Sequence, residues 1–156
     1  MTPAARRAYI RGFVGDDVQS LSNWAVECMS QGIESPSLIV LAGLSQDEGR
    51  MEVDRYFLAA LEELRQSPES VESESLRYAA NLSQDLIDGK LSARSVAREI
   101  ARVDESLQCR VELVEWRRVD VEFDLADDGV SSVGQAEHDA QIAAANLVSS
   151  INSKRG

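Results

Sequence analysis

The chain has few of the residues from which enzyme active sites and metal centres are usually built. Its 156 residues include one histidine, His138, and two cysteines, Cys28 and Cys109, which lie 81 positions apart. That spacing supports neither a zinc site nor a thioredoxin-like site, and it favours two buried thiols. Glu137 and Asp139 flank His138, but consecutive helical residues point about 100° apart and do not converge on one ion. We therefore expect His138 to be a solvent-exposed residue near the start of a helix.

The sequence motifs of common enzyme classes are also missing. The chain contains no GxSxG, no phosphate-binding P-loop, no HExxH and no Rossmann glycine pattern. We expect a protein that is not an enzyme, with no catalytic, cofactor-binding or metal-binding residues.

Aromatic residues and long apolar runs are scarce as well. Only eight residues are aromatic, and much of the apolar content is alanine, leucine and valine, which favours helices over sheets. No stretch approaches the roughly eighteen apolar residues of a transmembrane helix, and the N-terminus lacks the apolar core of a signal peptide. These absences predict a cytoplasmic protein. A length of 156 residues suits one domain over residues 1–156.

Positive charge is in short supply. The chain has 27 acidic and 16 basic side chains, which gives a formal net charge of −11. Binding to nucleic acid or to an anionic membrane relies on clustered lysine and arginine, so neither is an expected partner. The acidity either keeps the protein soluble or attracts a basic partner, and the composition fits both interpretations.

What the chain does have is a dense set of signals for helix starts and ends. Each of its three prolines directly follows a hydroxyl residue, a pair typical of an N-cap and the first helical residue. One further segment has the pattern of a capping box, and two glycines are placed to end helices. The predicted starts are Thr2-Pro3, Ser35-Pro36, Ser67-Pro68, Ser92 and the box Ser45-Gln46-Asp47-Glu48, and the predicted ends are Gly32 and Gly89.

Between these signals the apolar residues recur at spacings of three and four, which is the period of a helix that buries one face. We predict an all-α protein, a compact single-domain bundle of about six to eight helices. The small residues of the last stripe would allow a neighbouring helix to approach closely. The predicted core stripes are Val18, Leu21, Ala25 and Cys28; Val53, Phe57, Leu61 and Leu64; Leu76, Ala79, Ala80, Leu82 and Leu86; Val96, Ile100, Val103 and Leu107; and Ala136, Ala140, Ala143, Leu147 and Ile151.

Three segments depart from this simple pattern. Residues 38–44 are uniformly apolar and are expected to form a short, buried central helix. Residues 119–125, VDVEFDL, alternate strictly between apolar and acidic side chains, a pattern typical of a strand. Because no other segment offers a partner strand, we favour a short, irregular helix and keep the strand as the alternative. Residues 127–134 are rich in glycine and serine and are expected to form a mobile loop.

An acidic run contains the candidate binding residues. Eleven carboxylates lie between Asp104 and Asp139, against only three arginines. Such a run is either a solvated face or a docking surface for a basic partner. Calcium is not expected, because bulky residues occupy positions where the chain would have to fold around the ion. The candidate protein-binding residues are Glu112, Glu115, Trp116, Asp120, Glu122, Asp124, Asp127 and Asp128.

Two kinds of residue near this run have alternative interpretations. Trp116 is either a core residue, which we favour, or a partly exposed anchor of an interface. Three arginines spaced by four, Arg94, Arg98 and Arg102, either pair with acidic residues of a neighbouring helix or contact a phosphate. The acidity of the chain favours pairing.

The segment LSNWAVECMSQGIESPSLIVLAGLS, residues 21–45, resembles the signature of a family of small, uncharacterised bacterial helical proteins. The resemblance continues through residues 77–103 and through the closing EHDAQIAAANLVSSI. It implies a helical fold and an immunity or accessory role in bacterial toxin and competition systems. It implies no catalytic residues.

These observations lead to three hypotheses of function. The first is a non-catalytic protein-binding module, in particular an immunity protein that neutralises a basic toxin domain by direct binding. The second is a homo-oligomeric regulatory or structural protein that uses its alanine-rich last helix as the interface. The third is an enzyme with a carboxylate-based site, which is disfavoured because di-iron helical proteins use two histidines and the chain has one. The oligomeric state is left open.

Overall fold

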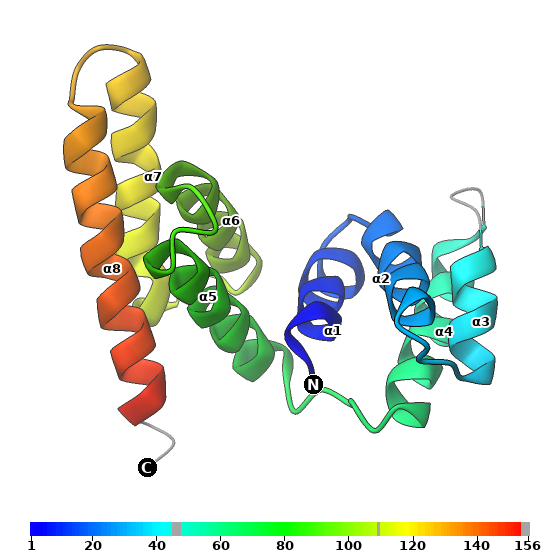
Figure 1. Ribbon diagram of the computed structural model, residues 1–156. Helices are drawn as coiled ribbons and strands as arrows, with labels where there is room; N and C mark the ends of the chain where they lie inside the picture. The colour runs from blue at the N-terminus through cyan, green and yellow to red at the C-terminus, as the bar shows by residue number, and fades with distance from the viewer. Residues whose placement is uncertain (45–47, 109, 154–156) are drawn as a thin grey trace. The chain divides into compact units, whose positions relative to one another are not determined.

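The computed structural model describes residues 1–44, 48–108 and 110–153 (Figure 1). Within these ranges every regular element is helical, which confirms the all-α prediction. Besides eight α-helices there is a π-helical segment, Tyr9–Val14, and a 3₁₀ turn, Val111–Leu113. The α-helices are α1 Pro3–Ala8, α2 Gln19–Ser30, α3 Pro36–Gly43, α4 Arg50–Glu63, α5 Val71–Ile87, α6 Ala93–Ser106, α7 Val114–Asp127 and α8 Val133–Ser153.

Contacts between residues divide the chain into two compact units, Met1–Glu74 and Ser75–Gly156. The sequence pattern predicts one domain over residues 1–156, and this stays a prediction. Each unit contains one of the two tryptophans, Trp24 in the first and Trp116 in the second, and both indoles are buried. The two units are described one at a time.

The first unit is built around a cluster of aromatic rings. Trp24 of α2 meets Phe57 of α4 edge to face, with ring centroids 5.3 Å apart. Tyr9 stacks on Phe13 at 5.3 Å, and Phe13 lies 6.3 Å from Phe57. Edge-to-face and stacked pairs at these separations are favourable arrangements of aromatic rings. Helix α3 packs between α2 and α4 and completes this unit.

A close approach between the π-helical segment and α2 explains why residue 12 is a glycine. A Cβ atom at Gly12 would lie 2.5 Å from Cδ2 of Leu21, which is fully buried. The carbonyl groups at the end of this segment accept hydrogen bonds from a side chain. Arg50 Nη2 donates to the carbonyls of Gly12 at 2.9 Å and Phe13 at 2.7 Å, and its Nε contacts Asp54 at 2.8 Å. Arg50 therefore satisfies backbone acceptors that have no partner at the end of a helix.

A buried ion pair joins α1 to the first turn of α5 within the first unit. Arg6 Nε lies 2.7 Å from Glu74 Oε2, and the two side chains are only 8% and 1% exposed. Arg6 Nη2 also donates to the carbonyl of Met1 at 3.2 Å. Glu72, in the same first turn of α5, is exposed. The sequence pattern does not indicate which of these two acids is buried.

The hydroxyl of Tyr9 provides a test of this buried cluster. Its pKa is raised above the ordinary value, first by burial and second by the negative charge of Glu74. The folded state therefore holds this proton more tightly than the unfolded chain does. Its contribution to stability is complete below about pH 10 and is lost as the pH rises through the folded-state pKa. Tyr9→Phe should flatten the fall in stability above about pH 10, as measured by urea unfolding. If Tyr9→Phe leaves the fall in stability above about pH 10 unchanged, the raised pKa of Tyr9 is not its cause.

The predicted helix boundaries are confirmed at five positions, one of which is Gly89, at φ +72° just after the end of α5. Thr2 and Ser35 cap α1 and α3, and their hydroxyl oxygens accept from Ala5 N and Leu38 N. Ser92 caps α6 in the same way. Gly32 ends α2 with φ +77°, a left-handed conformation that favours glycine.

Two predicted starts differ from the structure. Ser67-Pro68 does not begin a helix, because α5 begins at Val71 and the Ser70 hydroxyl accepts from Ser73 N at 3.1 Å. Ser70 offers the same kind of cap three residues later. The N-cap of α4 is Gly49 rather than Ser45. The first three residues of the predicted capping box, 45–47, lie outside the described residues, as does Cys109, whereas Cys28 is buried as expected.

Helix α3 is less buried than its sequence predicts. Leu38 and Leu41 are fully buried, but Ile39 is 49% exposed and Val40 is 39% exposed. The helix packs on α2 and α4 with one face only, so its uniformly apolar composition leaves two side chains facing solvent. The expectation of a buried central helix is therefore wrong for Ile39 and Val40.

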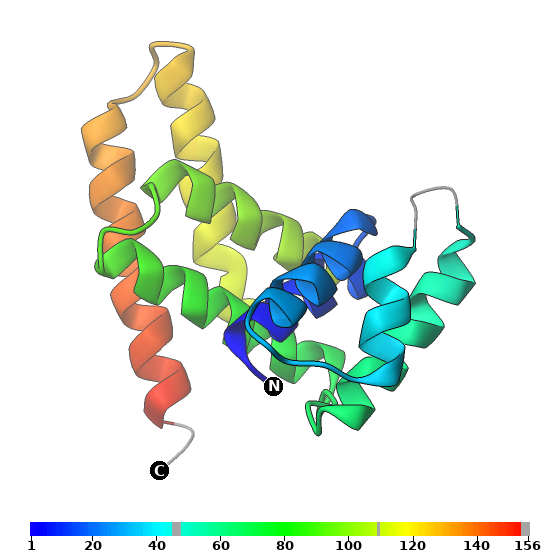
Figure 2. The same ribbon diagram turned by 45° about the vertical axis from the view of Figure 1, so that its right-hand side comes forward.

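The second unit consists of most of α5 together with α6, α7 and α8. Helices α7 and α8 run side by side and are joined by residues 128–132, while α5 and α6 lie across them (Figures 1 and 2). Residues 119–125 lie in α7, so the helical interpretation of this segment is confirmed and the strand is wrong, although the helix is a regular one of 14 residues and not short and irregular. No helix in the described ranges has the length and apolar character needed to cross a membrane.

The alanine-rich face of α8 is used inside its own unit. Ala136, Ala140, Ala143 and Ala144 are at most 1% exposed, and α8 contacts both α7 and α6. The expected close approach of a neighbouring helix is therefore an intramolecular one. These four alanines are therefore engaged within the chain itself, and the hypothesis of a homo-oligomer that uses its last helix stays a prediction.

Candidate protein-binding surface

Helix α7 has apolar side chains on two opposite faces. Trp116, Val119 and Phe123, spaced by three and four, face the core and are at most 2% exposed. Val114 and Val121, seven residues apart, are 50% and 55% exposed. Because the two stripes interleave along one helix, residues 119–125 alternate like a strand although the backbone is helical. Helix α7 therefore has a second apolar face that is not buried within its own unit.

The structure separates the predicted binding residues into three groups. The first is Trp116 alone, which is 1% exposed, so its interpretation as a partly exposed anchor is wrong and the core interpretation is confirmed. The second group faces α6 and consists of Asp120, Asp124 and Asp127. The third group consists of Glu115 and Glu122 of α7, Glu112 of the 3₁₀ turn and Asp128, which directly follows α7.

The acids of the second group form a ladder of ion pairs with α6. Arg98 Nη2 lies 2.7 Å from Asp124 Oδ1, and Arg98 Nε lies 3.5 Å from Asp120 Oδ1. Arg94 donates to both carboxylate oxygens of Asp127, with Nη1 at 2.6 Å from Oδ1. That bidentate hydrogen bond is the main reason why the pKa of Asp127 is lowered. These pairs confirm, for Arg94 and Arg98, the predicted pairing with a neighbouring helix.

This pairing changes what the acidic run can do. Pairs this exposed contribute little to stability, but they neutralise the negative charge on the α6 side of α7. Arg102, the third arginine of the series, lies 4.0 Å from Glu99 of its own helix. The carboxylates that face α6 are therefore occupied by arginines of the same unit, and a basic partner would have to displace them.

The third group keeps negative charge on the outer side of α7. Glu112 lies 3.9 Å from Arg110. Glu115 and Glu122 are half-buried, Asp128 is exposed, and none of the three has a basic partner within the described ranges. The two glutamates each follow a valine of the exposed stripe by one residue. They therefore line one edge of that stripe.

An ion pair links α7 to α8 on the same outer side. Arg118 Nη1 lies 3.1 Å from Asp139 Oδ2, and Gln135 Nε2 donates to Asp139 Oδ1 at 2.8 Å. These hydrogen bonds, that of Gln135 first, lower the pKa of Asp139. Ile142, one turn further along α8, is 44% exposed.

We define the outer face of α7 as Val114, Glu115, Arg118, Val121, Glu122 and Leu125. Leu125 is half-buried and continues the valine stripe by four residues. Val111, in the preceding 3₁₀ turn, is 85% exposed and extends the stripe in the other direction. Residues 111, 114, 118, 121 and 125 follow a 3-4-3-4 spacing, but the buried stripe of Trp116, Val119 and Phe123 interleaves with them, so periodicity alone did not reveal this face.

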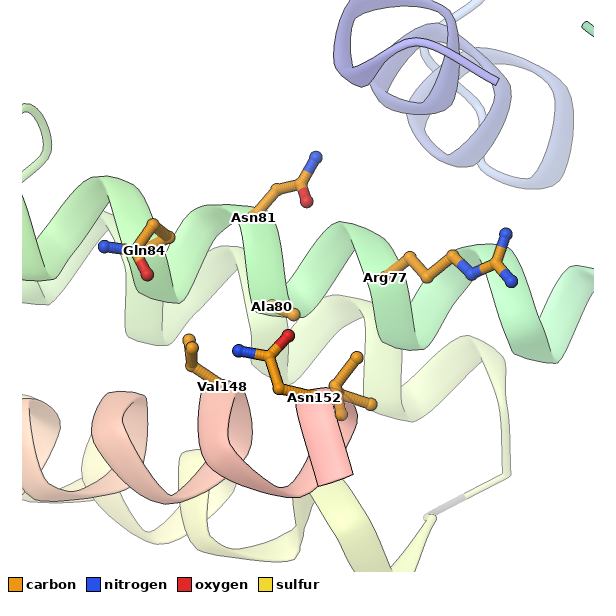
Figure 3. A pocket seen from close by; sticks show the side chains of 7 residues that line it. Arg77, Ala80, Asn81, Gln84, Val148 and Asn152 are labelled. Atoms are coloured by element: carbon orange, nitrogen blue, oxygen red, sulfur yellow. The ribbon is translucent and has the colours of Figure 1, made fainter. Parts of the chain in front are cut away.

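In each unit, the described part of the surface includes a pocket between two helices. One, of about 170 Å³, lies between α5 and α8, where Val148 and Asn152 point toward Ala80 (Figure 3). Its polar lining consists of Arg77 and the amides of Asn81, Gln84 and Asn152. This lining includes no nucleophile with an adjacent base.

The second pocket, of about 190 Å³, lies between α1 and α2. Arg7, Arg11 and Glu27 line it together with Ser20 and Asn23. Ser20 donates to Asp17 at 2.6 Å, and Arg11 lies 3.2 Å from the same carboxylate. Arg11 is thus engaged by a carboxylate that lies beside the pocket.

The remaining candidate ligands do not come together. His138 is exposed on α8, as expected. Within the part of the chain that the structure describes, no three histidine, cysteine, aspartate or glutamate side chains are grouped closely enough to hold a metal ion.

Comparison of the chain with models of protein families, with curated proteins and with solved structures found no match in any of the three.

Proposed function

We propose that the chain is a non-catalytic protein-binding module that recognises its partner through the outer face of α7. The observation that carries the proposal is the exposed valine stripe of a helix whose opposite face is fixed in the core. Single exposed valines are ordinary, whereas an aligned row of them on one helix marks an interaction site. A helix already held by Trp116, Val119 and Phe123 also loses little conformational entropy on binding.

The partner that we propose is basic. The first unit has 13 acidic and 6 basic side chains, and the second has 14 and 10. Both units are therefore negatively charged, and their combined field would speed the encounter with a positively charged protein. The more specific form of the proposal is an immunity protein that neutralises a bacterial toxin by binding it in the cytoplasm. The resemblance of residues 21–45 to a bacterial family motivates this form.

Affinity capture with matched variants tests the proposal. The tagged full chain, its Val114→Ser/Val121→Ser variant and a Val26→Ser/Ile39→Ser control would be used to capture proteins from the native cell. Val26 and Ile39 are 53% and 49% exposed, close to the values for the two α7 valines, but they lie on α2 and α3. We expect a stoichiometric partner that the α7 variant loses and the control retains. No stoichiometric partner at low and moderate salt, or equal capture by both variants, would contradict the proposal.

The immunity form has its own test. The captured protein would be expressed in bacterial cells alone and together with the chain. We expect growth arrest without the chain and normal growth with it. The Val114→Ser/Val121→Ser variant should fail to protect, whereas the Val26→Ser/Ile39→Ser control should protect fully. A captured protein that is harmless on its own would count against the immunity form and leave the binding module in place.

A further inference from the structure

We propose that the partner presents an amphipathic helix to the outer face of α7, with an apolar stripe at heptad spacing flanked by lysine or arginine. This inference rests on the proposed function and specifies the partner's chemistry. It would make the complex a helix-on-helix contact in which apolar anchors supply affinity and edge charges select the partner.

The spacing of the exposed residues favours a helix as the occupant. Val114, Arg118, Val121 and Leu125 are separated by four, three and four residues, which is the alternation that packs one helix along another. From Val114 to Leu125 the stripe is about 16 Å long at a rise of about 1.5 Å per residue. A partner helix of about three to four turns covers that length.

The charges along the stripe favour a basic helix. Glu115 and Glu122 stand seven residues apart on one edge, and neither has a basic partner within the described ranges. Arg118 lies in the middle of the stripe, but its charge is engaged by Asp139 at 3.1 Å. The uncompensated charge at the edge is therefore negative. Lysine or arginine at the flanking positions of the partner would complement it.

The same charges disfavour a second copy of the chain as the occupant. Two α7 helices packed along this stripe would bring Glu115 and Glu122 of both copies to one seam. Each copy also carries a formal net charge of −11. Like charges at the edges of a helix pair disfavour its formation, so we infer a different, basic chain.

Two synthetic peptides test this chemistry on the full chain. Both are labelled helical peptides with leucine at heptad spacing; one has lysine at the flanking positions and the other has glutamate. Fluorescence anisotropy would compare the wild type, Val114→Ser/Val121→Ser, Glu115→Gln/Glu122→Gln and the Val26→Ser/Ile39→Ser control, with circular dichroism to show that each variant is folded. We expect the lysine peptide to bind and the glutamate peptide not to bind. The valine variant should lose about tenfold or more in affinity because two apolar contacts are removed.

The glutamate variant should weaken binding of the lysine peptide and make it less dependent on salt, whereas the control should bind like the wild type. Equal binding to the valine variant, or equal binding of both peptides, would overturn the inference. The inference would also be overturned if sedimentation showed that the wild type self-associates with rising concentration and that Val114→Ser/Val121→Ser does not. The lysine peptide should also displace a captured natural partner. If a partner is captured but not displaced, this inference fails and the proposed function stands; if the peptide binds and no partner is captured, the proposed function fails.

Discussion

Replacing Glu74 with alanine is expected to lower the free energy of unfolding of the first unit by about 3–5 kcal/mol. The variant leaves the Arg6 guanidinium, 8% exposed in the wild type, without the carboxylate that lies 2.7 Å from its Nε. Removing one member of a buried pair is costly because the remaining charge stays in a poorly solvated place. Unfolding in urea would be followed in a Trp116→Phe background, where Trp24 reports on the first unit alone.

Two control variants sharpen this test. Glu72→Ala removes an exposed acid from the same first turn of α5 and should change the free energy of unfolding by less than about 1 kcal/mol. The double variant Arg6→Met/Glu74→Leu removes both charges and should recover most of the loss, since apolar side chains of similar volume often replace a buried pair without penalty. If Glu74→Ala costs no more than Glu72→Ala, the pair is not buried as described.

Asp104→Ala is expected to destabilise the second unit by about 2–4 kcal/mol. Asp104 is fully buried; its Oδ1 accepts from the backbone N–H of Arg110 at 2.7 Å, and its Oδ2 lies 2.6 Å from Nε of Arg117. The loss should be smaller than for Glu74, because Arg117 is 38% exposed and water can solvate it. The measurement is urea unfolding in a Trp24→Phe background, where Trp116 reports on the second unit.

The neighbouring and conservative variants separate the causes. Glu105→Ala changes an exposed acid of the same helix and should have little effect. Asp104→Asn keeps an acceptor for the Arg110 N–H but loses the ion pair. It should therefore lower the free energy of unfolding more than Glu105→Ala does and less than Asp104→Ala does. A cost for Asp104→Asn equal to that of Asp104→Ala would show that the charge pair, rather than the hydrogen bond, carries the effect. Equal stability of all three variants would contradict the assigned role of Asp104.

Local signals predicted much of the helical architecture because they act within a few residues. A hydroxyl at Ser35 can accept from Leu38 N wherever the helix later packs, and Gly32 can adopt a left-handed turn without strain. The prediction failed where two neighbouring residues offered the same signal. Ser70 caps α5 instead of Ser67, and the choice between them depends on where α5 has to begin in the folded chain.

The candidate surface could be predicted only in part. The acids of α7 are evident in the sequence, but which of them stay available depends on α6, whose Arg94 and Arg98 engage Asp127 and Asp124. The valine stripe was hidden because its residues interleave with the buried stripe of Trp116 and Val119 and produce a strand-like alternation. An apolar residue on a helix can face the core or the solvent, and periodicity alone cannot distinguish two stripes on opposite faces.

By itself the sequence determined that this chain is helical, where several of its helices begin and end, and that it is strongly acidic, because capping, glycine conformation and charge count are properties of the local chain. Only the tertiary structure decided which acids are buried against arginines, as at Glu74 and Asp104, and which apolar stripe of α7 remains in solvent. Those outcomes depend on side chains that are distant in sequence and meet only when the helices pack.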